Sequence, residues 1–394
     1  MKLAACVVCL VACVEPGLET ETQEVSTAVR HERYGLIRDA AAEMGLYNAP
    51  LLAGIAISET NLAHCQAEAT YACKGPASPS CGGGPIIAGA ADGPCDLMQG
   101  GLGMFQFDAG TYSQTVTTYG ESILTIEGNT AQAVNFVVER AIQDIDGVTD
   151  WLTAVAWMNA VPMDAAGMQQ WASFIVCRYN GCCTTSSTCV TRANGYRDNA
   201  LMAFEEMGAD FWNTSTRCAK LPDDGIIDQR SECYLAGGDP RYWHVETGGY
   251  GDDREWTGTT SASNPANFAR WLVRGASGHY HVEVHLDAGE FGASKQASYE
   301  IHHAGVVDTV VVDQSANDGW FALGDFEFSG EGDEFIALGD NTGEPAAMDI
   351  KLLFDAVKVE SLDRGGGCCG ASSHPASALL LALVVLALIG RRRR

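Results

Sequence analysis

Ten cysteines lie in clusters between Cys65 and Cys233 of this 394-residue chain. Their even number, in segments rich in Gly and Pro, predicts a disulfide framework that forms in an oxidising compartment. Structural zinc is the alternative, but none of the ten cysteines forms the CxxC pair typical of such sites, so we expect no metal and no cofactor. Spacing alone leaves the disulfide pairing open.

The net charge of the chain is -26, from 50 acidic and 24 basic residues. A chain with so few cations cannot neutralise many phosphates, which argues against nucleic acid as a partner. Acidity of this kind is typical of the solvated surface of an exported protein. The length allows roughly two or three domains, each with its own core.

The N-terminus resembles an export signal. Residues 1–13 contain one basic residue, Lys2, followed by an apolar run. The run ends in Leu-Val-Ala-Cys, which resembles a bacterial lipobox and implies lipidation at Cys13; an ordinary signal peptide is the alternative. Residues 14–30 are acidic and Thr-rich without periodicity, which predicts a solvated tether.

The next part of the chain, residues 31–212, shows apolar positions at helical spacing. We expect Asn48 to cap a helix with Pro50 in its first turn, and Thr130 to cap another. Residues 65–101 have no periodic run and are expected to form a loop stapled by disulfides. Further helices are predicted at 151–160, 168–176 and 199–207.

Glu59 is the most unusual residue of the Pro50 helix. It continues the apolar stripe formed by Leu52, Ile55 and Ala56. A carboxyl group on a buried stripe is costly to ionise. The pattern therefore predicts an acid that stays protonated near neutral pH, as a general acid must.

The period changes from helical to two after a Cys-containing linker at 213–240. Tyr280, Val282 and Val284 alternate with polar residues, and Gly, Asn and Asp recur between such runs. This pattern predicts an all-β sandwich over residues 241–363. Four aromatic residues of this part are candidates for stacking on sugar rings, with a core position as the alternative for each: Tyr250, Trp256, Trp271 and Trp320.

Four segments resemble, in the same order, the soluble lytic transglycosylase and goose-type lysozyme superfamily. The first is Ile-Ser-Glu-Thr-Asn-Leu at 57–62, and the second is Gly-Leu-Gly-Met-Phe-Gln-Phe at 101–107, followed by a threonine at 111. The third is Arg-Tyr-Asn-Gly at 178–181, and the fourth begins at Tyr196. The resemblance implies a mainly α, lysozyme-like fold.

The resemblance also implies roles for individual residues. Glu59 would be the general acid that protonates the leaving oxygen of a glycosidic bond. The implied substrate-binding residues are Gln106, Tyr179, Asn180 and Thr60. A transglycosylase needs no second carboxylate, because a sugar hydroxyl attacks the anomeric carbon. A hydrolase would need one, and Asp108 is the nearest candidate in the sequence.

The β part resembles the golvesin C-terminal, xanthan-lyase-like binding domain. The resemblance rests on Tyr-Trp at 242–243, Gly-Tyr-Gly-Asp-Asp at 249–253, Trp-Phe-Ala-Leu-Gly at 320–324 and Phe-Asp-Ala-Val at 354–357. It implies a non-catalytic module associated with carbohydrate.

The C-terminal residues 364–394 contain three features in order. A Gly-rich hinge carries Cys368 and Cys369, an apolar run of fourteen residues interrupted only by Ser377 follows at 376–389, and four arginines come last. The apolar run is short for a stable membrane span. The order resembles the myxobacterial sorting signal MYXO-CTERM, which implies processing near Cys368 and Cys369 by a sorting protease and display at the cell surface.

These observations predict an α+β multidomain protein in which a disulfide-stapled lysozyme-like domain precedes a β-sandwich. The function we expect is cleavage of MurNAc–GlcNAc bonds in peptidoglycan by an exported, membrane-anchored enzyme. Its partners would be an envelope polysaccharide, the membrane and a sorting protease. The alternative is a non-catalytic surface protein for carbohydrate binding or adhesion, with a degenerate lysozyme-like domain.

Overall fold

The computed structural model describes residues 25–69, 72–90, 94–95, 99–214, 217–287, 292–331 and 334–363. The expected export signal with Cys13 and the expected sorting tail with Cys368 and Cys369 lie outside these ranges. Within them, no helix has the length and apolar character that crossing a membrane requires.

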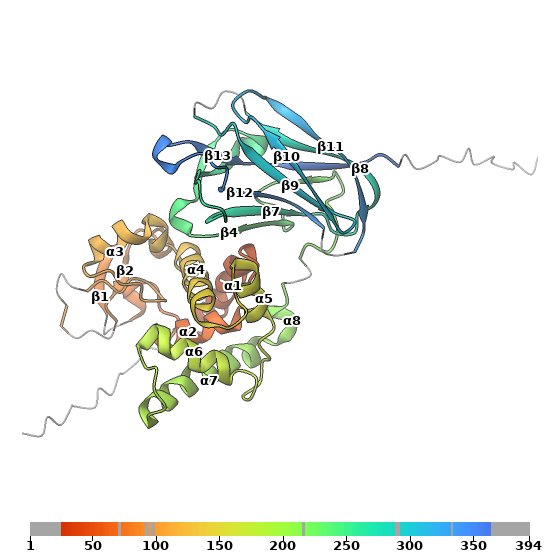
Figure 1. Cartoon of the computed structure of the whole chain (residues 1–394). Helices are drawn as coiled ribbons and strands as arrows, with labels where there is room; N and C mark the ends of the chain where they lie inside the picture. The colour runs from red at the N-terminus through yellow and green to blue at the C-terminus, as the bar shows by residue number, and fades with distance from the viewer. Residues whose placement is uncertain are drawn as a thin grey trace, which may run out of the picture.

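Helices dominate the described chain up to Trp212 (Figure 1). They are α1 Thr27–Glu43, α2 Pro50–Thr60, α3 Tyr112–Tyr119, α4 Ile126–Asp144, α5 Trp151–Asn159, α6 Gln169–Asn180, α7 Ser187–Met207 and α8 Ala209–Trp212. A small antiparallel hairpin of β1 Cys73–Ala77 and β2 Pro85–Ala88 lies between α2 and α3.

The helices share one apolar core, to which α2 contributes more than a single stripe. Leu52, Ile55 and Ala56 are fully buried together with Leu51 and Ala53 on the other sides of the helix. Helix α7 can approach α2 closely because Gly54 has no side chain: a Cβ atom there would lie 2.6 Å from the Cβ of Ala200. This close packing brings α7 against the end of α2 that carries Glu59.

Antiparallel sheets form the second half of the molecule. A five-stranded sheet has the order β10-β9-β12-β7-β4, and a four-stranded sheet has the order β11-β8-β14-β3, with a three-stranded sheet β13-β6-β5 beside them. The strands are β3 Ile226–Ile227, β4 Tyr234–Gly237, β5 His244–Thr247, β6 Asp253–Gly258, β7 Phe268–Leu272, β8 Ser277–Leu286, β9 Ala297–His303, β10 Val306–Val312, β11 Gly319–Ser329, β12 Phe335–Gly339, β13 Lys351–Phe354 and β14 Val357–Ser361.

The two larger sheets enclose a second core, separate from that of the helices. Trp271 from β7, Val284 from β8 and Ile301 from β9 are all buried in it. In β8 the alternation predicted from the sequence is present, because Val282, Val284 and Leu286 face this core while the residues between them are half-exposed. Helices followed by antiparallel sheets confirm the predicted fold class.

The ten clustered cysteines form five disulfides, which confirms the predicted framework. The pairs are Cys65–Cys81, Cys73–Cys95, Cys177–Cys183, Cys182–Cys189 and Cys218–Cys233. Disulfides of this density are typical of an oxidising, extracellular environment. Two of them bracket the end of α6, and two hold the segment around the β1–β2 hairpin.

Several local predictions were wrong. Asn48 does not cap α2; its side-chain amide instead donates to the carbonyls of Met158 and Val161, and Ala49 is the N-cap. Thr125, not Thr130, caps α4, because the helix begins one turn earlier than its apolar stripe. Residues 65–101, expected to be a loop, contain the β1–β2 hairpin.

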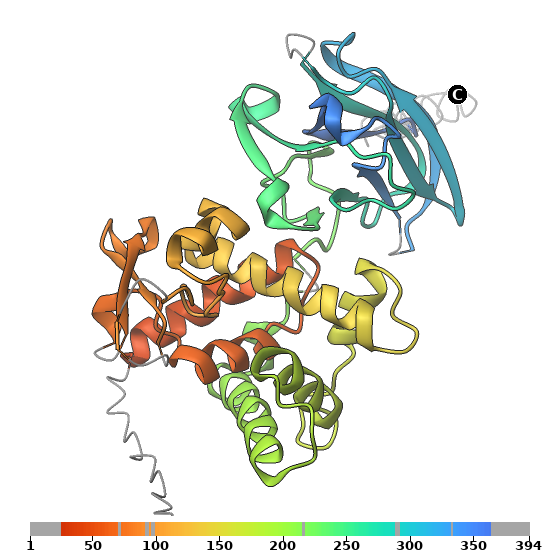
Figure 2. The same ribbon diagram turned by 60° about the vertical axis from the view of Figure 1, so that its left-hand side comes forward.

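The sheets meet the helices through β4 and the adjoining turns (Figures 1 and 2). Figure 2 shows α6 and α7 on the side of the helices that faces away from the sheets. At the contact, Arg241 donates to the carbonyl of Thr118 at 2.8 Å, and the rings of Trp151 and Phe268 lie 6.1 Å apart. Strands β3 and β4 pair with strands of the larger sheets, although they fall in the segment 213–240 that was expected to be a linker.

Candidate active site

Glu59 lies in the last turn of α2, where the chain leaves the helix. Asn61 follows in the left-handed conformation, with φ of 52°, and ends the helix. The Glu59 side chain is half-buried and lies against α6 and α7. Its Oε1 atom accepts a hydrogen bond from the hydroxyl of Tyr196 in α7 and a longer one, 3.4 Å, from the amide of Asn180 at the end of α6.

The environment of Glu59 favours its protonated form. Burial raises the pKa of the Glu59 carboxyl group, and the hydrogen bonds from Tyr196 and Asn180 lower it by a smaller amount, so that the pKa is above its ordinary value. Among the described residues, no second carboxylate contributes to this shift. Glu59 is therefore an acid that retains its proton closer to neutral pH than an exposed glutamate does.

The two hydrogen bonds also decide where the proton of Glu59 resides. Both end on Oε1, whereas no bond from a described residue to Oε2 is found. An oxygen that already accepts donors is the poorer place for a proton. The acidic proton of Glu59 therefore belongs on Oε2, the oxygen to which no described residue donates.

Tyr196 and Asn180 are themselves connected. The Asn180 amide donates to the Tyr196 hydroxyl at 2.5 Å. Tyr196 is 4% exposed, and its burial together with the negative charge of Glu59 raises its pKa, so that it stays a donor. Asn180 is exposed at the last position of α6, where Gly181 adopts φ of 63° and ends the helix.

Tyr179 ends a row of aromatic rings that leads to Glu59. Its ring lies 5.1 Å from Phe136, which lies 6.3 Å from Phe107, and Phe107 lies 5.4 Å from Tyr119. The Tyr179 hydroxyl is buried and has no hydrogen-bond partner among the described residues. Burial, and next the charge of Glu59, raise the pKa of Tyr179. Half-exposed rings in such a row offer rigid apolar faces next to an acid.

Gln106 and Thr60 are engaged within the protein. The Gln106 side chain donates to the carbonyl of Gly103 at 2.7 Å and accepts from the backbone N–H of Ala90 at 2.8 Å. Thr60 is 2% exposed, and its hydroxyl donates to the carbonyl of Met104 at 3.1 Å. In this geometry both side chains bond to the backbone near Glu59, and their expected contact with substrate stays a prediction.

Asp108 is exposed and caps a turn. Its Oδ1 atom accepts from the backbone N–H of Gly110 at 2.7 Å. Its negative charge acts on Tyr119, at the far end of the aromatic row, and not on Glu59. The geometry therefore pairs Glu59 with two neutral donors and not with a second acid.

Tyr196 is a partner of Glu59 that was not among the residues expected at the site. A signal was present, because Ala193, Tyr196, Ala200 and Ala203 follow helical spacing and all are buried in α7. A tyrosine on a stripe of alanines packs its hydroxyl against the neighbouring helix. The sequence does not show that this neighbouring helix is α2.

In the described part of the chain, no three His, Cys, Asp or Glu side chains lie close enough together to hold a metal ion. Two histidines of β8 pair with separate carboxylates, His281 with Asp325 and His285 with Asp355.

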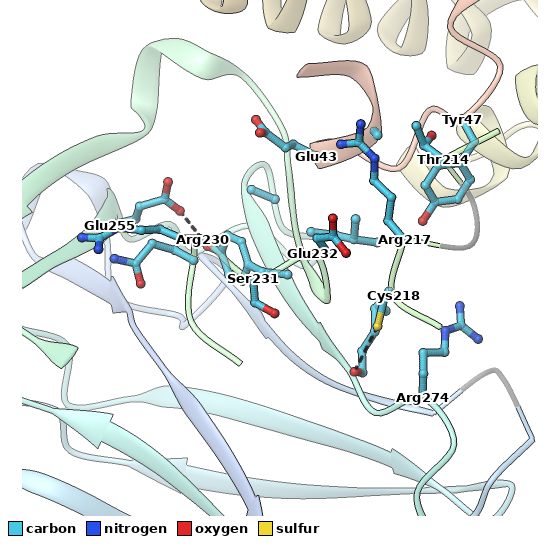
Figure 3. A pocket seen from close by; sticks show the side chains of 16 residues that line it. Glu43, Tyr47, Thr214, Arg217, Cys218, Arg230, Ser231, Glu232, Glu255 and Arg274 are labelled. Atoms are coloured by element: carbon cyan, nitrogen blue, oxygen red, sulfur yellow. Dashed lines mark hydrogen bonds between the residues drawn. The ribbon is translucent and has the colours of Figure 1, made fainter. Parts of the chain in front are cut away.

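A pocket of about 250 Å³ lies where the helices meet the sheets (Figure 3). Glu43 from α1 and Glu255 from β6 both line it. The hydroxyl of Tyr234 donates to Glu255 at 2.7 Å. Burial, assisted by the nearby Glu43, raises the pKa of Glu255 to about 7 in spite of that bond, and burial also raises the pKa of Glu43. The junction thus holds two acids from different halves of the molecule.

Residues 228–361 match the family model described as the Golvesin C-terminal domain. The match begins at Asp228, just after β3, and ends with β14. It supports the resemblance of the β part to that family. No curated protein matches the chain significantly.

Three solved structures align with about a third of the chain. Paenibacillus xanthan lyase aligns at 21% identity and a TM-score of 0.29, over 35% of this chain and 13% of that one. A Podospora anserina GH26-CBM35 β-(1,4)-mannanase aligns at 17% identity and a TM-score of 0.25, over 36% of this chain and 29% of that one. TmCBM61 in complex with β-1,4-galactotriose aligns at 10% identity and a TM-score of 0.20, over 37% of this chain and 89% of that one. The chain spans only a small part of the first two proteins. At TM-scores this low, the alignments carry no conclusion about fold or ligand.

Proposed function

We propose that this chain is an exported, lytic-transglycosylase-like enzyme that cuts MurNAc–GlcNAc bonds of peptidoglycan, with Glu59 as the general acid. The observation that supports the proposal is the geometry of Glu59. It is half-buried, its pKa is raised, and its Oε1 is occupied by Tyr196 and Asn180. An acid in this state can deliver a proton from Oε2 to a glycosidic oxygen.

The proposed reaction needs only one carboxyl group. Glu59 protonates the leaving oxygen as the bond to the anomeric carbon breaks. The C6 hydroxyl of the MurNAc residue forms the new bond to that carbon and gives its proton to the Glu59 carboxylate, which restores the acid. The neutral donors Tyr196 and Asn180 stabilise the carboxylate between the two steps.

Substrate binding is assigned to the surface next to Glu59. Asn180 is exposed, and its two amide N–H donors are directed to Glu59 and Tyr196, so its side-chain oxygen is the atom that would accept from the N–H of an acetamido group. The rings of Tyr179, Phe136 and Tyr119 would contact the apolar faces of neighbouring sugars.

The β part would keep the enzyme on its polymer. Its match to the Golvesin C-terminal domain supports a carbohydrate-associated module. Lipidation at Cys13 and sorting at Cys368 and Cys369 would place the protein at the cell envelope, anchored to the membrane and processed by a sorting protease.

Digestion of purified sacculi tests the proposal. The parent protein should release muropeptides with 1,6-anhydro ends, identified by mass, and Glu59→Gln should lower the rate by about a thousandfold or more, because proton donation is lost. Glu205→Gln, at an exposed position of α7, is the matched control and should leave the rate unchanged. Reducing, non-anhydro ends would indicate a hydrolase instead. No products from the parent would contradict the enzyme proposal and favour the non-catalytic surface protein.

A further inference from the structure

A cluster of aromatic and polar side chains lies at one end of the four-stranded sheet, far along the chain from Glu59. Trp320 of β11 and His285 of β8 stand opposite each other in the strand register, with their rings 5.2 Å apart. The ring of Tyr250, from the turn 250–252, lies 5.5 Å from Trp320 and 5.8 Å from His285. All three side chains are half-exposed. We call Tyr250, His285, Trp320 and Asp355 the Tyr250 cluster.

Asp355 forms the floor of the Tyr250 cluster. It is 6% exposed, and its carboxylate accepts from the backbone N–H groups of Tyr250 and Ala356 and from Nδ1 of His285 at 2.8 Å. A buried carboxylate is costly unless it is bonded in this way. The turn that carries Tyr250 and the imidazole of His285 are thus both fixed by one buried group.

Asp355 also fixes the hydrogen-bonding capacity of His285. An ionised carboxylate can only accept, so Nδ1 of His285 carries the proton that it donates. In the neutral imidazole, Nε2 then has a free lone pair. The cluster therefore combines two aromatic faces with one oriented acceptor.

The other aromatic candidates of the β part do not offer such faces. Trp271 is 1% exposed, and its indole N–H donates to the carbonyl of Asp355. His244 stacks on Trp256 at 4.1 Å, and the Lys351 ammonium lies 4.8 Å from the centre of the same ring. Of the four candidates, only Tyr250 and Trp320 lie in contact with each other and keep half-exposed rings.

The charges beside the cluster narrow the class of ligand. Lys358 lies 5.9 Å from the centre of the Trp320 ring and pairs with both Glu283, at 3.0 Å, and Glu360, at 3.1 Å. One cation shared by two carboxylates leaves this face acidic. Such a face accepts hydrogen bonds from hydroxyl groups and repels polyanions.

We propose that the Tyr250 cluster binds a pyranose ring of an uncharged, hydroxyl-rich glycan strand. The C–H face of the sugar would pack against Trp320 and Tyr250, and a sugar hydroxyl would donate to Nε2 of His285. The inference rests on the carbohydrate-binding half of the proposed function and does not depend on cleavage by Glu59.

The test uses the full chain carrying Glu59→Gln, so that the polymer stays intact during the measurement. Migration is followed in native gels containing β-1,4-galactan, β-1,4-mannan or anionic xanthan, and retention is followed on purified sacculi. We expect binding to at least one of the two neutral polymers or to sacculi, with Trp320→Ala weakening it by about tenfold or more, as loss of a central aromatic contact does. The control is Tyr242→Ala, which removes another aromatic side chain, 50% exposed, from the β part and should bind as the parent does.

Three outcomes overturn the inference: no binding of any probe, binding to xanthan alone, and equal binding by a folded Trp320→Ala protein. Melting temperatures show whether each variant is folded. If Trp320→Ala fails to fold, Trp320→Leu replaces it, because leucine fills part of the space but has no aromatic face. The binding test and the cleavage test can give different answers. If Trp320→Ala loses binding while the parent protein does not digest sacculi, the sugar site is supported and the role of Glu59 is contradicted.

Discussion

The pKa of Glu59 reflects two opposing effects. Burial disfavours the carboxylate, whereas donors favour it. In this site burial prevails although the Tyr196 hydroxyl bonds directly to Oε1, and the pKa is raised. Opposing effects of this kind suit an acid that must both give up and recover a proton, because an acid fixed in either state cannot complete a cycle.

Removing the Tyr196 hydroxyl should therefore shift the pH dependence of the digestion rate in a defined direction. In Tyr196→Phe the carboxylate of Glu59 loses its closest donor, so its pKa rises further. Because the active form is the protonated one, the alkaline limb of the pH–rate profile should move up by about one pH unit, as expected for a hydrogen bond to a charged group. The maximal rate should fall by roughly tenfold as Glu59 loses its orientation. Initial rates of sacculus digestion across the acid and neutral range measure both effects.

Tyr112→Phe is the matched control for this substitution. Tyr112 is half-exposed on α3 and does not contact Glu59 in the structure. Its pH profile should coincide with that of the parent. An alkaline limb in Tyr196→Phe that stays in place or moves down would contradict the role assigned to the Tyr196–Glu59 bond.

Part of the candidate site could be predicted from the sequence and part could not. The stripe of Leu52, Ile55 and Ala56 identified Glu59 as an acid in an apolar setting, and the structure also brings Asn180 to it. The internal bonds of Gln106 and Thr60 could not be predicted, because they depend on where the fold places the backbone atoms of Ala90 and Met104. A residue type shows what a side chain can bond, whereas the neighbouring backbone decides what it does bond.

At the scale of elements, periodicity found the helices but not always their ends. The expected helix at 168–176 extends to Asn180, and the one at 199–207 begins at Ser187. Both differences lie next to the disulfides Cys177–Cys183 and Cys182–Cys189. Covalent links hold a turn of helix whose own sequence, rich in Cys, Thr and Ser, has low helical propensity, and such tertiary support is not visible in the local pattern.

The α2–α7 contact should be sensitive to a single methyl group. In Gly54→Ala the new Cβ atom would lie 2.6 Å from the Cβ and 2.8 Å from the backbone nitrogen of Ala200. Backbone atoms cannot rotate away, so the helices must separate, at a cost of about 1–3 kcal/mol in the free energy of unfolding. Because Tyr196 lies one turn before Ala200, its hydroxyl would also move from Glu59. Thermal unfolding and the rate of sacculus digestion should both decrease.

Gly35→Ala is the control, and we expect it to change the free energy of unfolding in the opposite direction. Gly35 lies within α1, and nothing lies within 4 Å of the position its Cβ would occupy. Alanine there should stabilise the helix by about 0.5–1 kcal/mol, without effect on digestion. Equal changes in the two variants would show that helical propensity, and not contact with α7, determines the result.

At the scale of the whole molecule, two separate cores are joined through a contact surface of both polar and aromatic side chains. The surface includes the Arg241–Thr118 hydrogen bond, the Trp151–Phe268 contact and the pocket containing Glu43 and Glu255. The sequence identified both halves by their different periods. It could not predict the contact between them, because Glu43 and Glu255 lie far apart in the chain and each resembles an ordinary surface acid.

The acid pair at this junction makes stability depend on pH in a predictable direction. Glu255 has a pKa of about 7 in the folded protein against 4.5 for an ordinary glutamate. Between these values the folded state binds more protons than the unfolded state, so the contribution of Glu255 to the free energy of unfolding decreases as pH rises and is constant above about pH 7. The raised pKa of Glu43 acts in the same direction.

Replacing Glu255 by glutamine isolates this contribution from all others. The Tyr234 hydroxyl can still donate to the glutamine oxygen, so the substitution removes the charge and keeps the bond. Relative to the parent, Glu255→Gln should gain stability between about pH 5 and about pH 8, by up to roughly 3 kcal/mol. Urea unfolding at the two pH values measures the gain, and Glu205→Gln, which alters an exposed acid, should show none. If Glu255→Gln and the parent show the same difference in the free energy of unfolding between the two pH values, the prediction is contradicted. The junction would then open enough for water to solvate the acid in the folded state.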